Sequence, residues 1–175
     1  SIFGRGLWRT VEGGSRTYVS RLAAAFKGEA RTGVRVVGVR RDATGVDLRL
    51  ASGKVERFDE VVIATHGDQA LALLEDPGAE ETRLLSAFRY SRNLTVLHTD
   101  PALMPRRRAA WTSWNHLGRR GSAEEGSVTY WMNKLQSLPA QPELFVTLNP
   151  NREIAPEAVI RTEVYENPLF DAGAL

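Results

Sequence analysis

Aromatic and amide side chains gather in two predicted strands in the second half of the chain. The first strand runs from Ala110 to His116 and the second from Ser127 to Asn133. A sheet face that mixes tryptophan with asparagine is typical of an amphipathic pocket wall, where rings supply contact area and amides orient a ligand. The alternative is that the rings pack beneath the sheet with their polar ends satisfied. The candidate substrate-binding residues are Trp114, Tyr130, Trp131 and Asn133.

Strand parity prevents these four side chains from all facing one way. On the second strand Trp131 and Asn133 share a face, whereas Tyr130 and Met132 continue an apolar alternation that would face the helices. We therefore favour Trp131 as the pocket wall and Asn133 as the source of an orienting hydrogen bond.

A second candidate site lies where a short apolar run meets a helix. The β-branched residues of Val61–Ala64 favour a strand that is buried on both faces. Thr65 and His66 follow at once, and helical character begins at Gln69. A buried strand that opens a helix through a small-residue turn is how open α/β sheets present a ligand crevice. The backbone N–H groups at such a helix start would face an anion or a flavin edge, unless this is an ordinary strand-turn-helix junction.

Several other chemistries have no supporting pattern. His66, His98 and His116 lack helical ligand spacing and the chain has no cysteine, so we expect no metal site. Neither a serine-hydrolase elbow nor a Walker-type loop is present. The net charge of +2 is too small to argue for a nucleic-acid partner. No stretch approaches the roughly 18 apolar residues of a membrane span, and no signal peptide is visible, so we expect a cytoplasmic protein.

The surrounding pattern predicts an α+β fold. A hydrophobic fraction of 42% and a charged fraction of 25% are those of a soluble globular protein. Consecutive strands joined by short loops favour a mixed, mostly antiparallel sheet with flanking helices. Helices are expected from an N-cap at Ser15 to Phe26, at 69–74 and at 81–88. Strands are expected at 34–41, 46–50, 61–64, 94–99, 110–116, 127–133, 144–148 and 159–165, with a loop at 118–126 and a helical turn opened by Pro156.

Residues 32–70 also carry a motif. It runs V-x-x-V-R-R-D-x-x-G-V-x-L and ends in F-D-x-V-V-I-A-T. This order resembles the third FAD-contacting segment of flavin-dependent amine oxidases, a superfamily that includes protoporphyrinogen oxidases and phytoene desaturases. The closest likeness is to a bacterial group of predicted NAD/FAD-binding proteins of the amine oxidase type. The segments that add to it are Trp8–Ser15, His98–Asp100, Trp114–His116, Tyr130–Gln136 and Val146–Pro150.

The resemblance implies FAD as the cofactor and assigns roles along the chain. The backbone of Val36 would meet the adenine end, and Ala64, Thr65 and His66 would lie against the FAD. Residues 1–31 would form a helical lead-in with a Gly-Gly-Ser cap. Residues 32–76 would supply the β-hairpin and strand-turn-helix segment of the FAD domain, and residues 77–175 a sheet like that of the substrate domain.

The dinucleotide fingerprint G-x-G-x-x-G is absent from the sequence, because the third glycine after Gly4 and Gly6 would fall at Arg9. The resemblance therefore implies a central fragment whose partners are the remaining N- and C-terminal parts of the FAD domain. The complete protein would oxidise a small organic substrate, an amine among the candidates, by hydride transfer to flavin. This chain alone would be inactive and would bind FAD weakly or not at all. The alternative is a non-catalytic binding or assembly domain that has kept the fold.

Overall fold

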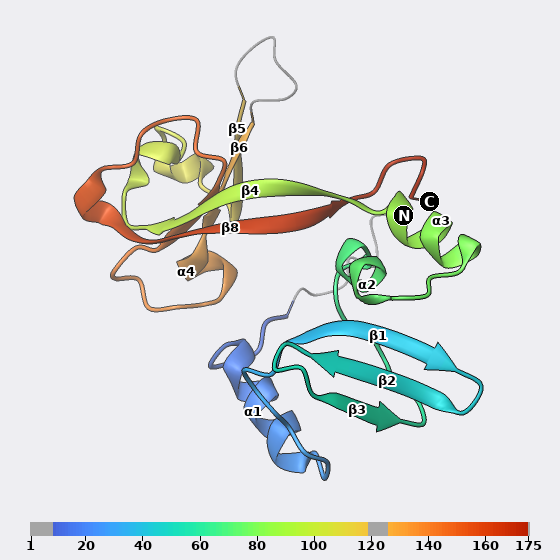
Figure 1. The fold of residues 1–175 in the computed structure, drawn as a ribbon. Helices are drawn as coiled ribbons and strands as arrows, with labels where there is room; N and C mark the ends of the chain where they lie inside the picture. The colour runs from blue at the N-terminus through green and yellow to red at the C-terminus, as the bar shows by residue number, and fades with distance from the viewer. Residues whose placement is uncertain (1–8, 119–125, 175) are drawn as a thin grey trace, which may run out of the picture. The chain divides into compact units, whose positions relative to one another are not determined.

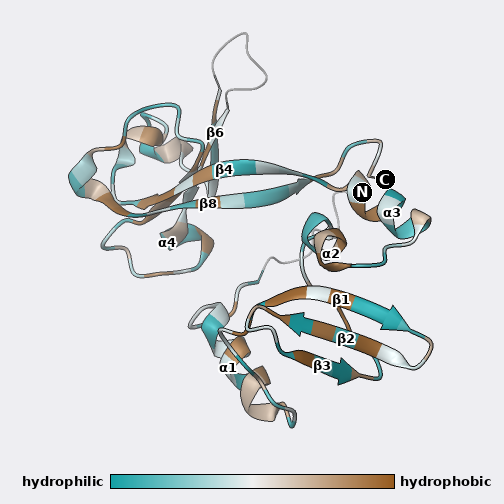
Figure 2. Cartoon of the chain, in the orientation of Figure 1, coloured by the Kyte–Doolittle hydropathy of each residue, from teal (hydrophilic) through white to brown (hydrophobic). Residues whose placement is uncertain are grey.

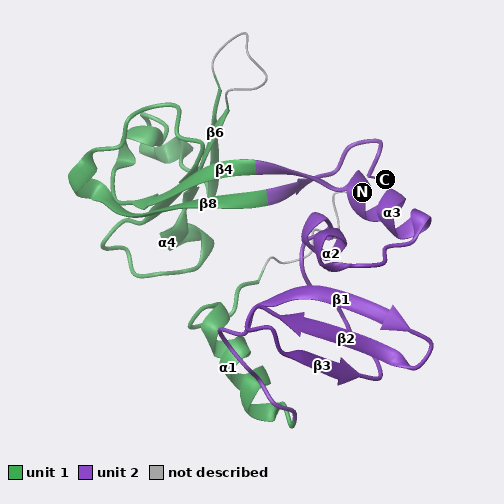
Figure 3. Ribbon diagram, viewed as in Figure 1, with its two compact units in different colours: residues 1–27, 92–166 green, residues 28–91, 167–175 purple. Residues whose placement is uncertain are grey.

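The computed structural model describes residues 9–118 and 126–174 and divides into two compact units (Figures 1 and 3). The first unit comprises residues 1–27 and 92–166, and the second comprises residues 28–91 and 167–175. Each unit contains a sheet with antiparallel pairing and one or more helices. The predicted α+β class is confirmed.

The described residues form α-helices, β-strands and short 3₁₀ turns. The α-helices are α1 (Ser15–Ala25), α2 (Gly67–Leu73), α3 (Ala79–Ala87) and α4 (Met132–Leu135). The strands are β1 (Val36–Asp42), β2 (Gly45–Leu50), β3 (Val55–Phe58), β4 (Arg89–His98), β5 (Trp114–Leu117), β6 (Ser127–Trp131), β7 (Phe145–Leu148) and β8 (Val159–Leu169). Short 3₁₀ turns lie at Pro101–Leu103, Arg108–Ala110 and Pro156–Ala158, the last as predicted.

The second unit is built on an antiparallel sheet with strand order β1-β2-β3. The turn between β1 and β2 forms locally, because the Asp42 carboxylate accepts the Thr44 N–H at 2.7 Å. Beyond α2 the chain returns to β1, where Val39 and Leu74 form a parallel bridge and Glu75 N–H donates to Val39 C=O at 2.9 Å. The helices α2 and α3 are thereby held beside the free edge of β1.

The first unit is built on a five-stranded sheet with order β5-β6-β7-β4-β8. One face of this sheet is covered by the unit's own core. That core has two clusters. Their members are Val96, Leu103 and Ile154 in one, and Met104, Trp111 and Phe145, with Trp131 packed against them, in the other. In Figure 2 hydrophobic and hydrophilic stretches both occur along β4 and β8.

The predicted buried strand at Val61–Ala64 is wrong. These residues belong to no helix or strand, and Val62 is 90% exposed. A β-branched run becomes a buried strand only when neighbouring strands accept its hydrogen bonds and cover its side chains. Within the described residues no strand flanks this run on either side.

Other predicted boundaries also shift. The second aromatic strand ends at Trp131 and gives way to α4, so Asn133 is helical. The first begins only at Trp114, after the 3₁₀ turn at 108–110. The last strand continues past Pro168 to Leu169, which an edge strand allows because proline's missing donor can face outward. The N-cap of helix α1 is Gly14, and Ser15, the predicted N-cap, is the first helical residue. Residues 119–125 of the predicted loop, together with Gly4 and Gly6, lie outside the described residues.

Candidate functional site

The backbone of Val36 lies on the open edge of β1. Val36 is in register with Leu50, and the flanking Ala51 N–H donates to Arg35 C=O at 2.9 Å. In an antiparallel ladder, bonds made by the flanking residues mark the enclosed pair as one that is not hydrogen-bonded to its partner. The N–H and C=O of Val36 therefore point away from β2, toward the edge of the sheet.

A bulge in β1 sets this direction. The register shifts between Val36 and Gly38, so one extra residue is inserted opposite β2. The shift brings the C=O of Val39, which accepts from Glu75, to the same edge as the polar groups of Val36. The edge of β1 is thus occupied by the α2–α3 segment at Val39 and presents one donor and one acceptor at Val36.

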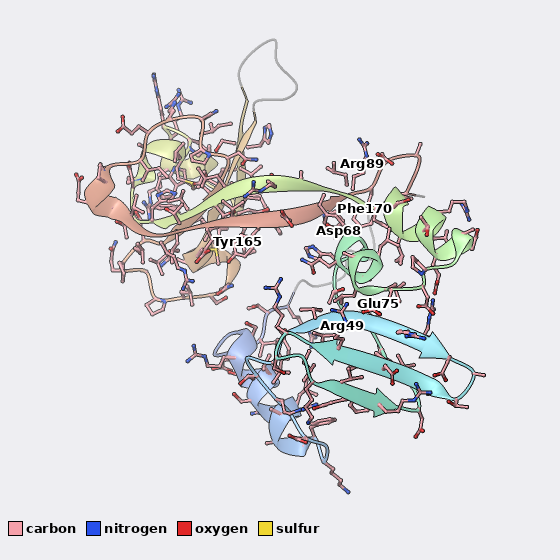
Figure 4. The ribbon with its side chains drawn as sticks, viewed as in Figure 1. Arg49, Asp68, Glu75, Arg89, Tyr165 and Phe170 are labelled. Atoms are coloured by element: carbon pink, nitrogen blue, oxygen red, sulfur yellow. The ribbon has the colours of Figure 1, made fainter. Side chains whose placement is uncertain are left out.

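An ion pair covers the bulge. Arg49 on β2 and Glu75 after α2 lie beside each other in Figure 4, and the Arg49 Nε–H donates to Glu75 Oε1 at 2.8 Å. A Cβ at Gly38 would collide with this pair, so Gly38 is the residue that lets the two side chains cross β1 closely. The pair fixes the segment after α2 against the strand that carries Val36.

The turn before α2 is exposed and is braced from behind. Ala64 and Thr65 are solvent-exposed, whereas the His66 ring stacks on Tyr90 with ring centroids 4.5 Å apart. The Tyr90 hydroxyl accepts the Gly67 N–H at 2.8 Å. The His66 Nδ1 is buried without a hydrogen-bond partner among the described residues. The turn is therefore held in place by Tyr90, with its two small residues left open on the surface.

The candidate substrate residues divide between the two faces of the five-stranded sheet. The register places Trp114 opposite Tyr130, and Tyr130 opposite Val146. This row lies on the face that the unit's core leaves open, where Trp114 is 49% exposed and Tyr130 is half-buried. The rings of Trp114 and Tyr130 meet edge to face with centroids 6.5 Å apart. Trp114 and Tyr130 thus form an accessible aromatic surface.

Trp131 belongs to the opposite, covered face. Its ring meets that of Trp111 edge to face at 5.3 Å, and the Arg108 guanidinium lies 5.4 Å from the ring centroid. The Trp131 Nε1 is buried without a hydrogen-bond partner among the described residues. We therefore do not carry forward the preference for Trp131 as the pocket wall.

Asn133 is buried in α4 and its amide is used within the chain. Its Nδ2 donates to the carbonyl groups of Pro139 and Pro142 at 2.6 and 2.9 Å, and its Oδ1 accepts the Leu144 N–H at 2.8 Å. Both donor hydrogens are engaged, so Asn133 fixes the connection from α4 to β7. We do not carry forward its role as the source of an orienting hydrogen bond to substrate, because both its Nδ2 and its Oδ1 have partners within the chain.

A polar network stiffens the covered face. His98 Nε2 lies 2.7 Å from the Thr147 Oγ1, which lies 2.9 Å from the Thr129 Oγ1. All three side chains are fully buried. Burial lowers the pKa of His98 below its ordinary value of 6.5, and the nearby Asp100 carboxylate opposes the shift. His98 is therefore neutral at neutral pH and acts as a structural member of the sheet.

Sequence reasoning missed Tyr90, the bulge in β1 and the polar network. Tyr90 is 24 residues from His66, and nothing in its neighbourhood marks it as a stacking partner. The four candidates in the aromatic strands fall in the first unit, while Val36, Ala64, Thr65 and His66 fall in the second. Each unit therefore carries its own set of candidate residues.

The chain belongs to the flavin-containing amine oxidoreductase family, which it matches over residues 1–150. Two solved structures share its fold. A fatty acid isomerase from P. acnes that produces CLA aligns with a TM-score of 0.56 at 11% identity, over 87% of this chain and 39% of its own. A protein assigned as a protoporphyrinogen oxidase from Exiguobacterium sp. 255-15 aligns with a TM-score of 0.57 at 14% identity, over 91% and 41%. The chain thus spans about two fifths of each structure. No curated protein matches it.

No helix within residues 9–118 and 126–174 has the length and apolar character needed to cross a bilayer. The same residues contain no group of three or more side chains placed to hold a metal ion.

Proposed function

We propose that this chain is part of an FAD-dependent oxidoreductase that oxidises a small organic molecule. Membership of the flavin-containing amine oxidoreductase family supports a flavin cofactor. When bound, a flavin supplies an acceptor for the hydride that leaves the substrate. The residues of this chain have two tasks in that reaction. Those of the second unit hold the cofactor, and those of the first unit bind and orient the substrate.

The observation that carries the proposal is the free donor and acceptor of Val36. An adenine edge offers an amino donor beside a ring-nitrogen acceptor, and this pair is complementary to one backbone N–H and one C=O. The bulge in β1 directs both groups of Val36 outward, and the Arg49–Glu75 pair holds the bulge in place. The described residues therefore fit the adenine end of FAD at Val36.

The turn at Ala64–His66 fits a second contact with the cofactor. Small exposed residues allow a ligand to approach the backbone closely. Ala64 and Thr65 are exposed, while the stack of His66 on Tyr90 fixes the turn. We propose that the N- and C-terminal parts of the FAD domain cover the exposed Val62. Residues 32–76 would then belong to that domain, and this chain alone would bind FAD weakly and have no activity.

The open face of the five-stranded sheet is proposed as the substrate wall, with Trp114 and Tyr130 in place of Trp131 and Asn133. Their rings present a broad apolar surface that would exclude water from the reacting centre. The buried His98–Thr147–Thr129 network keeps the strands beneath them rigid. The protein would act in the cytoplasm, a location that stays a prediction from the sequence.

A proline substitution tests the role of Val36 in the full-length protein that contains this chain. Val36→Pro removes an N–H that points away from β2, so no bond between β1 and β2 is lost and the protein should fold. It should lose most of its flavin, whereas Val36→Ile should keep it, because the contact uses only the backbone. Flavin content per folded protein is measured by absorbance, with circular dichroism as the check on folding. Full flavin occupancy in folded Val36→Pro would refute the assignment.

The alternative function is a binding or assembly domain that has kept the fold without catalysis. The exposed Val62 and the open aromatic face would then be protein contacts. The two functions separate in one experiment, because only the oxidoreductase has flavin that is bleached when a substrate is added without oxygen.

A further inference from the structure

An apolar row crosses the open face of the five-stranded sheet. The register aligns Trp114 on β5, Tyr130 on β6, Val146 on β7 and Leu97 on β4 in one line. Three of these side chains are half-buried and Trp114 is 49% exposed. Three strand spacings make the row about 14 Å long. The row is therefore a continuous surface for an extended apolar molecule.

A pocket opens at the Trp114 end of the row. Its volume is about 780 Å³, and Trp114 belongs both to its wall and to the row. The other side chains that line it are Arg9, Thr10, Ser113, Lys134, Leu135, Gln136 and Ser137. This lining contains two cations and no carboxylate, so the pocket favours an anion.

The two cations of this pocket have donors to offer. The Lys134 Nζ makes one long contact, 3.4 Å to the Trp111 C=O. Among the described residues neither Lys134 nor Arg9 forms an ion pair with a carboxylate. An anionic group that entered the pocket would therefore meet ammonium and guanidinium groups without first breaking an ion pair.

The opposite end of the row is different in character. A groove of about 200 Å³ lies between β4, β7 and β8, with Leu97 and Val146 in its wall and Tyr165 projecting from β8 (Figure 4). The charges at this end cancel, because the Arg161 Nε–H donates to Glu163 Oε1 at 2.8 Å. The row therefore has a cationic end and an electrically balanced end.

We infer that the substrate is an anionic amphiphile whose charged head lies in the Arg9–Lys134 pocket and whose extended apolar body lies along the row from Trp114 to Leu97. This rests on the proposed function, in which the open face is the substrate wall. A protonated amine is disfavoured as the head group, because both cations would repel it. The length of the row matches an alkyl chain of roughly a dozen carbons.

Direct binding of simple amphiphiles to the full-length protein tests this inference. Decanoate, decylamine and decanol are compared below their micelle concentrations by isothermal titration calorimetry. Decanoate should bind best, and Lys134→Gln should weaken it about tenfold without changing decanol. Arg9→Gln should act in the same way, while Arg106→Gln, an exposed arginine outside the pocket, should change neither. Equal affinities for decanoate and decylamine, or equal losses for decanoate and decanol, would overturn the inference.

A chain-length series tests the row separately from the head-group pocket. Affinity should rise roughly three- to fourfold per methylene up to about twelve carbons and then level off. Val146→Ser should weaken dodecanoate but not hexanoate, whose body ends before β7. An absence of length dependence would overturn the assignment of the row. Flavin absorbance, measured in the same sample, distinguishes failure of this inference from failure of the proposed function. Bound flavin without amphiphile binding would refute only the inference about the substrate. The absence of flavin would refute the proposed function.

Discussion

Replacement of Asn133 by alanine should lower stability sharply, because the amide joins three backbone groups. Its Nδ2 donates at 2.6 and 2.9 Å and its Oδ1 accepts at 2.8 Å, and the residue is 7% exposed. At about 0.5–1.5 kcal/mol for each hydrogen bond, Asn133→Ala should cost about 2–4 kcal/mol of the free energy of unfolding. For a protein of this size that corresponds to a fall in Tm of roughly 4–16 °C.

The assay is urea denaturation followed by tryptophan fluorescence, since Trp111 and Trp131 lie in the core that α4 adjoins. Gln136→Ala is the matched control, because this exposed amide, also on the α4 segment, makes no side-chain bond among the described contacts, and it should change stability by less than about 0.5 kcal/mol. An Asn133→Ala protein of unchanged stability that oxidised its substrate more slowly would refute the structural role. It would restore Asn133 as a substrate-binding residue.

Three further predictions concern separate parts of the chain. Burial lowers the pKa of His98 in the folded state, so the stability that neutral His98 contributes is full above about pH 6.5 and should be lost as the pH falls below that value. In thermal melts recorded at a series of pH values, His98→Gln should flatten this pH dependence of Tm. His116→Gln, a substitution at an exposed histidine, should leave the dependence unchanged. Gly45→Ala should cost about 1–3 kcal/mol in chemical denaturation, because its Cβ would lie 2.5 Å from the Phe58 carbonyl oxygen. Gly118→Ala, whose Cβ would have 3.6 Å of clearance, should be nearly neutral. Val62→Asp should leave the melting of this chain unchanged but lower the flavin content of the full-length protein, and unchanged flavin content would remove the proposed burial of Val62.

Local chemistry made much of the fold predictable. The hairpin of β1 and β2 follows from the Asp-Ala-Thr-Gly turn and from period-two alternation, both of which act over a few residues. The helical turn at Pro156 has the same kind of local cause. These signals need no partner from elsewhere in the chain, and for that reason they could be recognised in the sequence.

Features that depend on distant partners could not be predicted. Val61–Ala64 has the composition of a buried strand, but burial depends on neighbouring strands that the described residues do not supply. Helix α4 interrupts the predicted strand at a point where Asn133 binds backbone groups six to eleven residues away. The prediction that Tyr130 and Trp131 lie on opposite faces of β6 was correct. Which of the two faces the core covers, however, depends on Trp111 and Phe145. The preference for Trp131 over Tyr130 was therefore made without the information that decides it.

The direction of the Val36 N–H and C=O groups also could not be predicted from the sequence. The motif around β1 marked the residue, but the sequence does not show the bulge that turns its N–H and C=O to the free edge. A one-residue register shift reverses which backbone groups face the neighbouring strand. The fit of this edge to an adenine could thus be argued only once the register was known.

The central claim is tested most directly by comparing the absorption spectra of the purified full-length protein and of its Val36→Pro variant. The account predicts flavin bands near one equivalent per chain in the unaltered protein and their loss from the folded variant. Release of the bound flavin by denaturation and its identification as FAD by mass would complete the assignment. A folded, unaltered protein that carries no flavin and takes up none on titration would contradict the account.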